Sequence, residues 1–205
     1  GTGAIGFGKD QSGKMARAGG WGYYCGDEGS AYWLGKKLIS LFGKEADGRE
    51  EKTPIYEIVR QKFGISNDFE LITIVYDKLQ MKRDKIAELA LILYEAAIDG
   101  DQKAIAIYQE AAYEYSLIVK ALLNKLQFMP EKEVSVSYSG GVFKAGEFIL
   151  KPLKEFLSKE RVKFNQPILQ PVTGAALYAL FLEREKIDDA VLKKLKTEEE
   201  RVLRL

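Results

Sequence analysis

The sequence predicts an α/β fold in which a helical insertion interrupts a set of short strands. Three observations predict this class. A glycine-rich hairpin opens the chain, a stretch at about 53–126 repeats apolar residues at helical spacing, and strand and helix patterns alternate after Pro130. The 205 residues are enough to bury a hydrophobic core without disulfide bonds.

The hairpin is predicted from the first 26 residues, which hold nine of the 19 glycines. The runs 4–8 and 14–18 are separated by the turn sequence Asp10–Gly13, and two short runs joined in this way favour a β-hairpin. Residues between Tyr32 and Phe42 then recur at helical spacing, and Asp27 is a suitable residue to cap that helix.

The middle of the chain is predicted to be helical from Thr53 to Leu126. Pro54 suits the first turn of a helix, and a later apolar stripe ends at Asp99-Gly100. Asp101 can cap the helix that follows. The two longest apolar stripes are Ile86, Leu89, Ala90, Leu93 and Ala97, and Ile105, Tyr108, Ala112, Tyr115, Val119 and Leu122.

After Pro130 the pattern changes from helical spacing to alternation. Apolar residues alternate with serines before a glycine turn, and helical spacing then returns. The predicted elements are a strand at 134–138, a turn at 139–141, a helix through 148–157, a strand near 163–169, a helix from Gly174 to about Glu185, and a charged helix end at 197–205.

Composition excludes several classes of site. Lys and Arg number 31 against 30 Asp and Glu, so the net charge of +1 gives no electrostatic footprint for nucleic acid or an anionic membrane. The absence of histidine excludes Ser-His-Asp and Cys-His nucleophiles and histidine metal sites. Cys25 alone closes no intrachain disulfide and cannot hold a structural zinc. Carboxylates, hydroxyls, Lys, Arg and backbone N–H groups remain for chemistry.

Targeting segments are not visible in the sequence. The N-terminus lacks the basic and apolar regions of a signal peptide. The longest apolar stretches, at 89–93 and 175–182, are much shorter than the roughly 20 residues that span a bilayer. We therefore expect a cytoplasmic protein, and because the first residues read like the interior of a sequence, we expect a fragment of a longer chain.

Two glycine motifs are candidate anion sites. In Gly1-Thr2-Gly3 the glycines let backbone N–H groups approach an anion, and the Thr2 hydroxyl adds a donor. Ser139-Gly140-Gly141 lies between a predicted strand and a helix, where phosphates bind helix N-termini. For either motif, a tight turn that binds nothing is the competing interpretation.

The loop from Gly19 to Ser30 is the second candidate site. Several glycines surround Trp21, and ordering them on folding costs backbone entropy. A loop of this composition is therefore expected to have a particular shape that serves a function. In one interpretation Trp21 fills the core and Asp27 caps a helix. In the other, the backbone and Asp27 accept hydrogen bonds from the hydroxyl groups of a polar ligand, because a carboxylate can accept from both hydroxyls of a sugar diol.

Five motifs occur in an order that carries a resemblance. They are Gly1-Thr2-Gly3-Ala4, Ala18-Gly19-Gly20-Trp21-Gly22-Tyr23, Gly26-Asp27-Glu28-Gly29-Ser30-Ala31-Tyr32-Trp33-Leu34-Gly35, Ser139-Gly140-Gly141-Val142 and Pro171-Val172-Thr173-Gly174-Ala175-Ala176. From Gly1 to about Leu182 the chain resembles the N-acetylglucosamine kinase and BadF-type ATPase family of the actin-like sugar-kinase superfamily.

The resemblance implies a ribonuclease-H-like (actin-like ATPase) fold. Members have two such domains with the active site between them, and residues 1–205 resemble the second, C-terminal domain, with its helical segment at about 53–126. The first domain carries another phosphate hairpin, an acidic residue for the metal and the aspartate base. The resemblance therefore places no catalytic or metal residue in this chain, and the base is expected upstream of Gly1.

The resemblance also implies binding roles for individual residues. Gly20, Trp21 and Asp27 would line the sugar pocket. The residues that bind ATP would be Gly1, Thr2, Gly3, Ala97, Gly140, Gly141, Lys144 and Ala145. The chain departs from the family at Ala4, where members usually have serine.

The function that the resemblance implies is ATP-dependent phosphorylation of a hydroxyl of N-acetylglucosamine, glucosamine or a related hexose. ATP and Mg²⁺ are then the expected cofactors, and the sugar, the missing N-terminal domain and a second copy of the chain are the expected partners. The chain alone is expected to be inactive.

Two alternatives remain open. One is an ATPase that activates a dehydratase through an iron–sulfur cluster held between two subunits, for which two copies of Cys25 supply only two thiolates. The other is a non-catalytic module that binds sugar or nucleotide.

Overall fold

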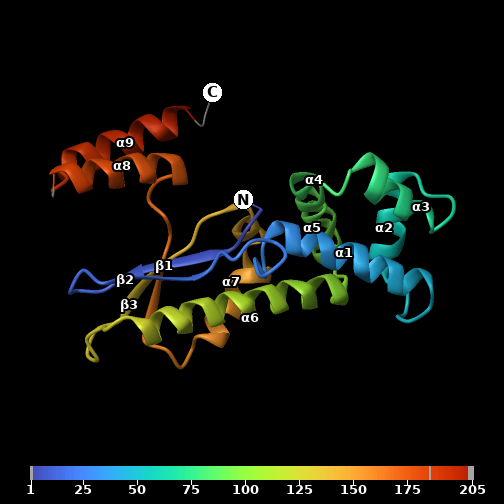
Figure 1. Cartoon of the computed structure of the whole chain (residues 1–205), viewed down its shortest axis with the longest axis horizontal. Coiled ribbons are helices and arrows are strands. Elements are labelled where there is room, and N and C mark those ends of the chain that lie inside the picture. The colour runs from blue at the N-terminus through green and yellow to red at the C-terminus, as the bar shows by residue number, and fades with distance from the viewer. Residues whose placement is uncertain (1, 185, 203–205) are drawn as a thin grey trace. The chain divides into compact units, whose positions relative to one another are not determined.

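The computed structural model describes residues 2–184 and 186–202 and has an α/β fold of helices with two small sheets (Figure 1). The chain divides into two compact units, Gly1–Lys132 with Gly141–Arg161 and Glu133–Gly140 with Val162–Leu205. The first unit contains β1 (Ile5–Lys9), β2 (Met15–Gly19), α1 (Ala31–Ala46), α2 (Pro54–Phe63), α3 (Glu70–Thr73), the π-helical turn η1 (Ile74–Lys78), α4 (Arg83–Glu88), α5 (Ala90–Ile98), α6 (Gln102–Lys125), the 3-10 turn η2 (Gly141–Ala145) and α7 (Glu147–Phe156). The second unit contains β3 (Val134–Ser137), β4 (Val162–Asn165), α8 (Pro171–Arg184) and α9 (Asp189–Val202).

The predicted hairpin is confirmed, one residue later along the chain than expected. Strands β1 and β2 pair antiparallel, with Ile5 opposite Gly19. Asp10 closes the turn, because its Oδ1 accepts hydrogen bonds from the backbone N–H groups of Ser12 and Lys14, each at 3.0 Å. Gly13 completes the turn with a φ of +87°, which side chains rarely adopt.

Glycines in β1 let helix α6 lie directly against the hairpin (Figure 1). A Cβ at Gly6 would overlap the Cγ2 of Ile118, and one at Gly8 would lie 2.7 Å from a methyl group of Leu126. Ile5 and Phe7 alternate with these glycines along β1, so their side chains point to the opposite face, and both are exposed. The glycine-rich composition of this segment is therefore explained by packing.

Two caps organise the helices of the larger unit. Ser30, not Asp27, caps α1, and its hydroxyl accepts from the Trp33 N–H at 3.3 Å, so the prediction for Asp27 as a helix cap is wrong. Asp101 caps α6 as predicted, accepting from Ala104 N at 3.0 Å. Its other oxygen accepts from the Ile55 N–H at 3.0 Å, so one carboxylate also holds the start of α2.

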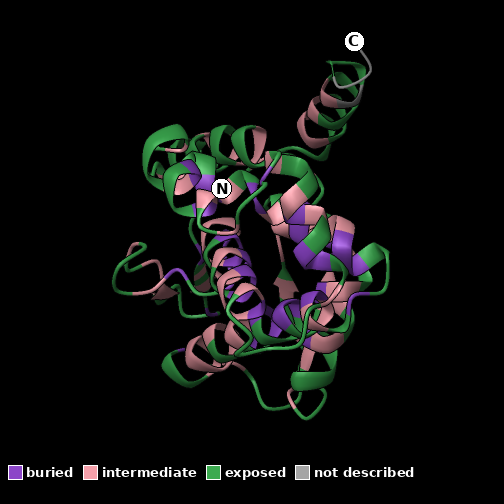
Figure 2. Cartoon of the chain, turned by 90° about the vertical axis from the view of Figure 1, so that its right-hand side faces the viewer, coloured by how far each residue is buried: buried purple, intermediate pink, exposed green. Residues whose placement is uncertain are grey.

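The helical segment predicted at about 53–126 is observed as α2 to α6. The stripe predicted between Ile86 and Ala97 is buried, but its helix is interrupted at Leu89 and forms α4 and α5. Figure 2 shows the buried residues on the inward sides of the helices. The largest fully buried side chains are Phe42, Leu34, Leu38, Ile55, Leu93, Ile149 and Leu157.

The smaller unit contains a parallel pair, β3 and β4, in which Val134 lies opposite Val162. Both strands end earlier than predicted, and α8 begins at Pro171 rather than Gly174, because proline suits a first helical turn. The predicted helix end at Glu185 and the last residues of the tail, 203–205, lie outside the described residues. Among the helices of residues 2–184 and 186–202, none is both long and apolar enough to cross a membrane.

Candidate functional site

The Gly-Thr-Gly segment and the loop that follows β2 meet at one end of the hairpin. The Ala4 N–H donates to Asp27 Oδ1 at 3.3 Å, and the Asp27 side chain is only 4% exposed. A Cβ at Gly3 would lie 2.9 Å from Asp27 Oδ2, so the carboxylate packs closely against the backbone of this glycine. Thr2 is part of the same segment, whereas Gly1 lies outside the described residues.

The backbone of Asp27 is in the left-handed region, with a φ of +62°. Non-glycine residues in such conformations cost about 1–3 kcal/mol and are common at functional sites. The surrounding contacts hold the conformation, because the Ser30 N–H donates to the Asp27 carbonyl at 3.1 Å. The carboxylate is thereby directed toward Gly3 and Ala4 and away from the start of α1.

Arg83, at the start of α4, completes this cluster. Its Nη2 donates to Asp27 Oδ2 at 2.6 Å and to the Thr2 carbonyl at 2.9 Å. Its guanidinium also lies 5.4 Å from the centre of the Tyr23 ring, within the range of a cation–π contact. Sequence reasoning missed Arg83, because the run 82–85 reads as a solvated charged stretch and is far along the chain from Asp27.

The loop before Asp27 presents Trp21 at the surface. The indole is 71% exposed, so the interpretation of Trp21 as a core residue is wrong. Gly20, with a φ of +68°, donates its N–H to the Ala4 carbonyl at 2.8 Å, which ties the loop to β1. Arg17 donates to the Gly20 carbonyl at 3.2 Å, and its guanidinium lies 5.9 Å from the indole.

Tyr115 of α6 joins the Asp27 loop to η2. Its hydroxyl donates to the Gly29 carbonyl at 2.8 Å, and its ring stacks on Phe143 with the centroids 5.1 Å apart. Burial raises the pKa of Tyr115 well above its usual value, so the hydroxyl stays a neutral donor. The sequence placed Tyr115 on an apolar stripe and carried no signal for this second contact.

The remaining residues that were predicted to bind ATP lie in different surroundings. Gly140 is exposed with a φ of +120° and is the last residue of a smaller-unit segment, and Gly141 opens η2 in the larger unit. The first α-helical residue after them is Glu147, so a 3-10 turn separates the glycine pair from α7. Lys144 is exposed and Ala145 is buried.

Ala97 lies within α5, where it is 2% exposed. The structure therefore brings together Thr2, Gly3, Gly20 and Asp27, and it places Ala97 in the helical core.

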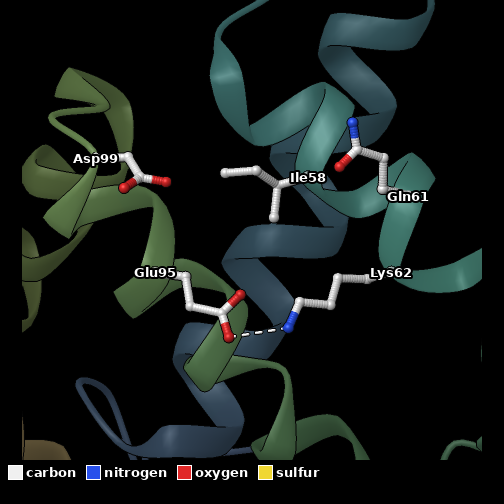
Figure 3. Close-up of a pocket in the computed structure, with 5 residues that line it drawn as sticks. All are labelled: Ile58, Gln61, Lys62, Glu95 and Asp99. Atoms are coloured by element: carbon white, nitrogen blue, oxygen red, sulfur yellow. Dashed lines mark hydrogen bonds and ion pairs between the residues drawn. The ribbon is translucent and has the colours of Figure 1, made fainter.

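A hollow of about 320 Å³ lies between α2 and the C-terminal end of α5, the helix that contains Ala97 (Figure 3). Figure 3 shows Lys62 directed toward Glu95, with the ammonium and carboxylate 2.9 Å apart. The other lining residues are Ile58, Gln61 and Asp99. The hollow is open, and its one base, Lys62, is paired with Glu95.

Within residues 2–184 and 186–202, no three Asp, Glu or Cys side chains gather closely enough to hold a metal ion. Asp27, the carboxylate that touches the Gly-Thr-Gly segment, is already paired with Arg83. Mg²⁺ is usually held by one or two carboxylates together with substrate phosphates and waters, so it does not require a group of three side chains.

Comparison with known proteins gives a consistent result. Residues 1–179 match the model of the BadF/BadG/BcrA/BcrD ATPase family. The chain is 33% identical over 188 residues to an N-acetylmuramic acid/N-acetylglucosamine kinase of Clostridium acetobutylicum, covering 92% of this chain and 60% of the relative. It is 30% identical over 186 residues to an N-acetyl-D-glucosamine kinase of Dictyostelium discoideum, covering 88% and 57%.

A solved structure also resembles the chain. It is a crystal structure from Chromobacterium violaceum, described as a candidate N-acetylglucosamine kinase, with a TM-score of 0.60 and 28% identity. The similarity covers 80% of this chain and 52% of that one. The chain thus spans little more than half the length of the proteins that it matches.

Proposed function

Because the chain belongs to the BadF/BadG/BcrA/BcrD ATPase family, we propose that the whole protein transfers a phosphoryl group from ATP to an amino-sugar hydroxyl. The curated relatives are named as kinases of N-acetylglucosamine and, in one case, of N-acetylmuramic acid. N-acetylglucosamine or a closely related hexose is therefore the proposed acceptor. This chain would line the sugar and contact part of the nucleotide.

The contact of Asp27 with the Gly3-Ala4 backbone carries the proposal. It brings a carboxylate, which accepts hydrogen bonds from sugar hydroxyls, beside a glycine segment whose N–H groups suit phosphate. A phosphoryl donor and its acceptor have to be held within reach of each other. Membership of the family supports the further proposal of a ribonuclease-H-like domain, in which Thr2 and Gly3 would bind the terminal phosphates.

In the proposed reaction Asp27 orients the sugar. Each of its oxygens uses one lone pair, on the Ala4 N–H and on Arg83, and keeps capacity for a hydroxyl donor. Trp21, which is exposed in the same loop, offers an apolar face to the sugar ring. Gly140, Gly141 and the exposed Lys144 would flank the adenosine and α-phosphate.

Positioning and neutralisation of charge dominate phosphoryl transfer, so these binding roles are the main contribution of this chain. The general base is expected outside it, and the chain is expected to be one domain of a two-domain kinase. The donor is proposed to be ATP used with Mg²⁺, and the protein is proposed to act in the cytoplasm.

An ATPase that activates a dehydratase has less support. The relatives reported above are named as sugar kinases, and the sequence has a single cysteine, Cys25. Two subunits would supply two thiolates to a cluster that is usually held by four.

The test is the steady-state kinetics of Asp27→Asn in the whole protein. Hydrogen bonds to charged groups contribute about 1.5–3 kcal/mol, so we expect the KM for N-acetylglucosamine to rise about tenfold to a hundredfold. The KM for ATP should change less than about twofold. Asp101→Asn is the matched control, because Asp101 is also buried and bonded to backbone N–H groups but serves α2 and α6.

An equal loss of affinity for sugar and ATP, or no loss of either, would contradict the proposed role of Asp27. A wild-type protein that releases no ADP with any amino sugar or hexose would contradict the proposed function itself.

A further inference from the structure

Arg83 contacts two segments to which the proposed function assigns different substrates. Its Nη2 bonds the Asp27 carboxylate, proposed for the sugar, and the Thr2 carbonyl, in the segment proposed for phosphate. We propose that Arg83 is a positioning residue, which holds the sugar-binding carboxylate at a fixed place beside the phosphate segment. This inference rests on the proposed function and adds a residue from the helical segment to the site.

The contact with Asp27 is short and is made through a single nitrogen, Nη2. A distance of 2.6 Å between Nη2 and Oδ2 is typical of a strong charge-assisted hydrogen bond. The Asp27 side chain is 4% exposed and that of Arg83 is 35% exposed, so only one side of the pair is solvated. A Cβ at Gly3 would lie 2.9 Å from both Nη2 and Oδ2, so the pair packs against the Gly3 backbone.

The remaining contacts of Arg83 indicate what fixes its position. The Nε atom is buried and has no hydrogen-bond partner among the described residues, which is unfavourable for a charged donor group. The position of the guanidinium therefore does not give all of its own N–H groups a hydrogen-bond acceptor. It is placed by the two bonds from Nη2 and by the face of Tyr23, 5.4 Å away.

Close packing of α1 and α4 brings Arg83 to Asp27. A Cβ at Gly35 of α1 would overlap the carbonyl oxygen of Ile86 in α4, so the two helices touch through their backbones. Ile86 lies about one turn after Arg83, and α1 begins shortly after Asp27. The helix pair thus carries both members of the ion pair and sets the distance between them.

Removal of the guanidinium would leave the Asp27 carboxylate free to rotate. Sugar hydroxyls would then lose a preoriented acceptor, and the acceptor hydroxyl would be aligned less often with the phosphoryl group. A positioning role therefore predicts a higher KM for the sugar and a lower kcat. A guanidinium that only covers Asp27 would give the opposite result, because its removal would open the carboxylate to the sugar.

The experiment compares Arg83→Met, Arg83→Lys and Arg60→Met in the whole protein, with N-acetylglucosamine varied at saturating ATP. Arg60 is the matched control, since it also bonds an aspartate, Asp68, and a backbone carbonyl, that of Ser66 at 3.0 Å, within the helical segment. We expect Arg83→Met to raise the sugar KM about tenfold and to lower kcat. Arg83→Lys should lie between it and wild type, because an ammonium keeps the charge but not the fork geometry.

The result for Arg60→Met separates positioning from a general loss of stability. We expect it to lower the melting temperature as Arg83→Met does, with the sugar KM within about twofold of wild type. An unchanged or lower sugar KM in Arg83→Met, or an equal rise in Arg60→Met, would overturn the role of Arg83 and leave the proposed function intact. Failure of the wild type to phosphorylate any sugar would overturn both.

Discussion

Three buried aspartates of the larger unit each accept a hydrogen bond from a distant backbone N–H group, and only two of them also complete a turn or a helix cap. Asp10, Asp27 and Asp101 each accept a backbone N–H from a distant part of the chain, at Gln127, Ala4 and Ile55 respectively. Asp10 and Asp101 also complete the turn or cap in which they stand. Asp27 instead has a left-handed backbone and an arginine partner, which distinguishes it as a candidate ligand residue.

Hydrogen bonds around the Asp10 carboxylate, first from the Ser12 hydroxyl and then from the Gln127 N–H, lower its pKa. A carboxyl group with a lowered pKa stabilises the folded state above its unfolded pKa, and this stabilisation is lost as the pH falls through the folded value. The turn of the hairpin is thus held by a group that remains ionised at neutral pH.

Alkaline unfolding should depend on two tyrosines of α6. Burial raises the pKa values of Tyr108 and Tyr115, so both keep their protons in the folded state at pH values where the unfolded chain has lost them. Stability should therefore fall as the pH rises above about 10, by at most about 1.4 kcal/mol per pH unit for each tyrosine. Urea unfolding of wild type between pH 9 and 12 measures this slope.

The variants Tyr108→Phe and Tyr115→Phe should each reduce the alkaline slope, and the double variant should reduce it most. If the double variant keeps the wild-type slope, other groups are responsible for it. Tyr115→Phe should in addition lower stability at pH 7, because its hydroxyl bonds the Gly29 carbonyl.

Helices and strands of this chain approach one another through glycines. Gly6 and Gly8 let β1 lie on α6, and Gly35 lets α1 touch α4. Gly35 is also the last residue of the Gly26–Gly35 motif, which is otherwise concerned with the Asp27 loop. Packing of α1 against α4 thus explains Gly35, to which the proposed function gives no binding role.

Gly35→Ala should destabilise the protein, and Gly43→Ala should not. The added methyl group at Gly35 would overlap a backbone carbonyl that cannot move freely, at a cost of about 1–3 kcal/mol or more. Gly43 lies in the same helix with nothing within 4 Å of an added Cβ, so alanine should stabilise the helix by about 0.5–1 kcal/mol. Urea unfolding at neutral pH distinguishes the two.

Equal and small effects of both glycine variants would show that α1 and α4 are not held in the close contact described. Because Arg83 stands at the start of α4, Gly35→Ala should also raise the sugar KM in the proposed function.

The comparisons show how much of the length of its relatives this chain spans. The chain covers 60% and 57% of its two curated relatives. Its described residues place the Asp27 carboxylate, which we propose binds the sugar, beside the Gly3-Ala4 backbone, which we propose binds phosphate. We expect a general base to be contributed from outside this chain, so binding and catalysis should be separable.

The chain of residues 1–205 alone should release no ADP in the presence of Mg²⁺, ATP and N-acetylglucosamine, whereas the whole protein should. The reason is that Asp27 is bonded to Arg83 and to the Ala4 N–H, and we expect the general base outside this chain. A coupled assay for ADP checks this, with Asp27→Asn of the whole protein as a control for sugar dependence. Sugar-dependent ADP release by the chain alone would refute the expectation.

The sequence alone determined the α/β class, the hairpin with its Asp10 turn, the helical segment and the cap at Asp101. These features depend on residues that are neighbours along the chain, so periodicity and turn chemistry report them. It also singled out the motifs at Gly3 and Asp27, but not their contact. The cap at Ser30, the exposure of Trp21 and the pairing of Asp27 with Arg83 were decided by the tertiary structure.

The physical reason lies in the range of the interactions involved. Arg83 is 56 residues from Asp27, and a charged residue at the start of a short helix has the same local pattern whether it is solvated or buried against a carboxylate. Only the close approach of α1 and α4 through Gly35 brings the two charges together. Local chemistry therefore sets the elements, and the packing of helix backbones decides which side chains form the site.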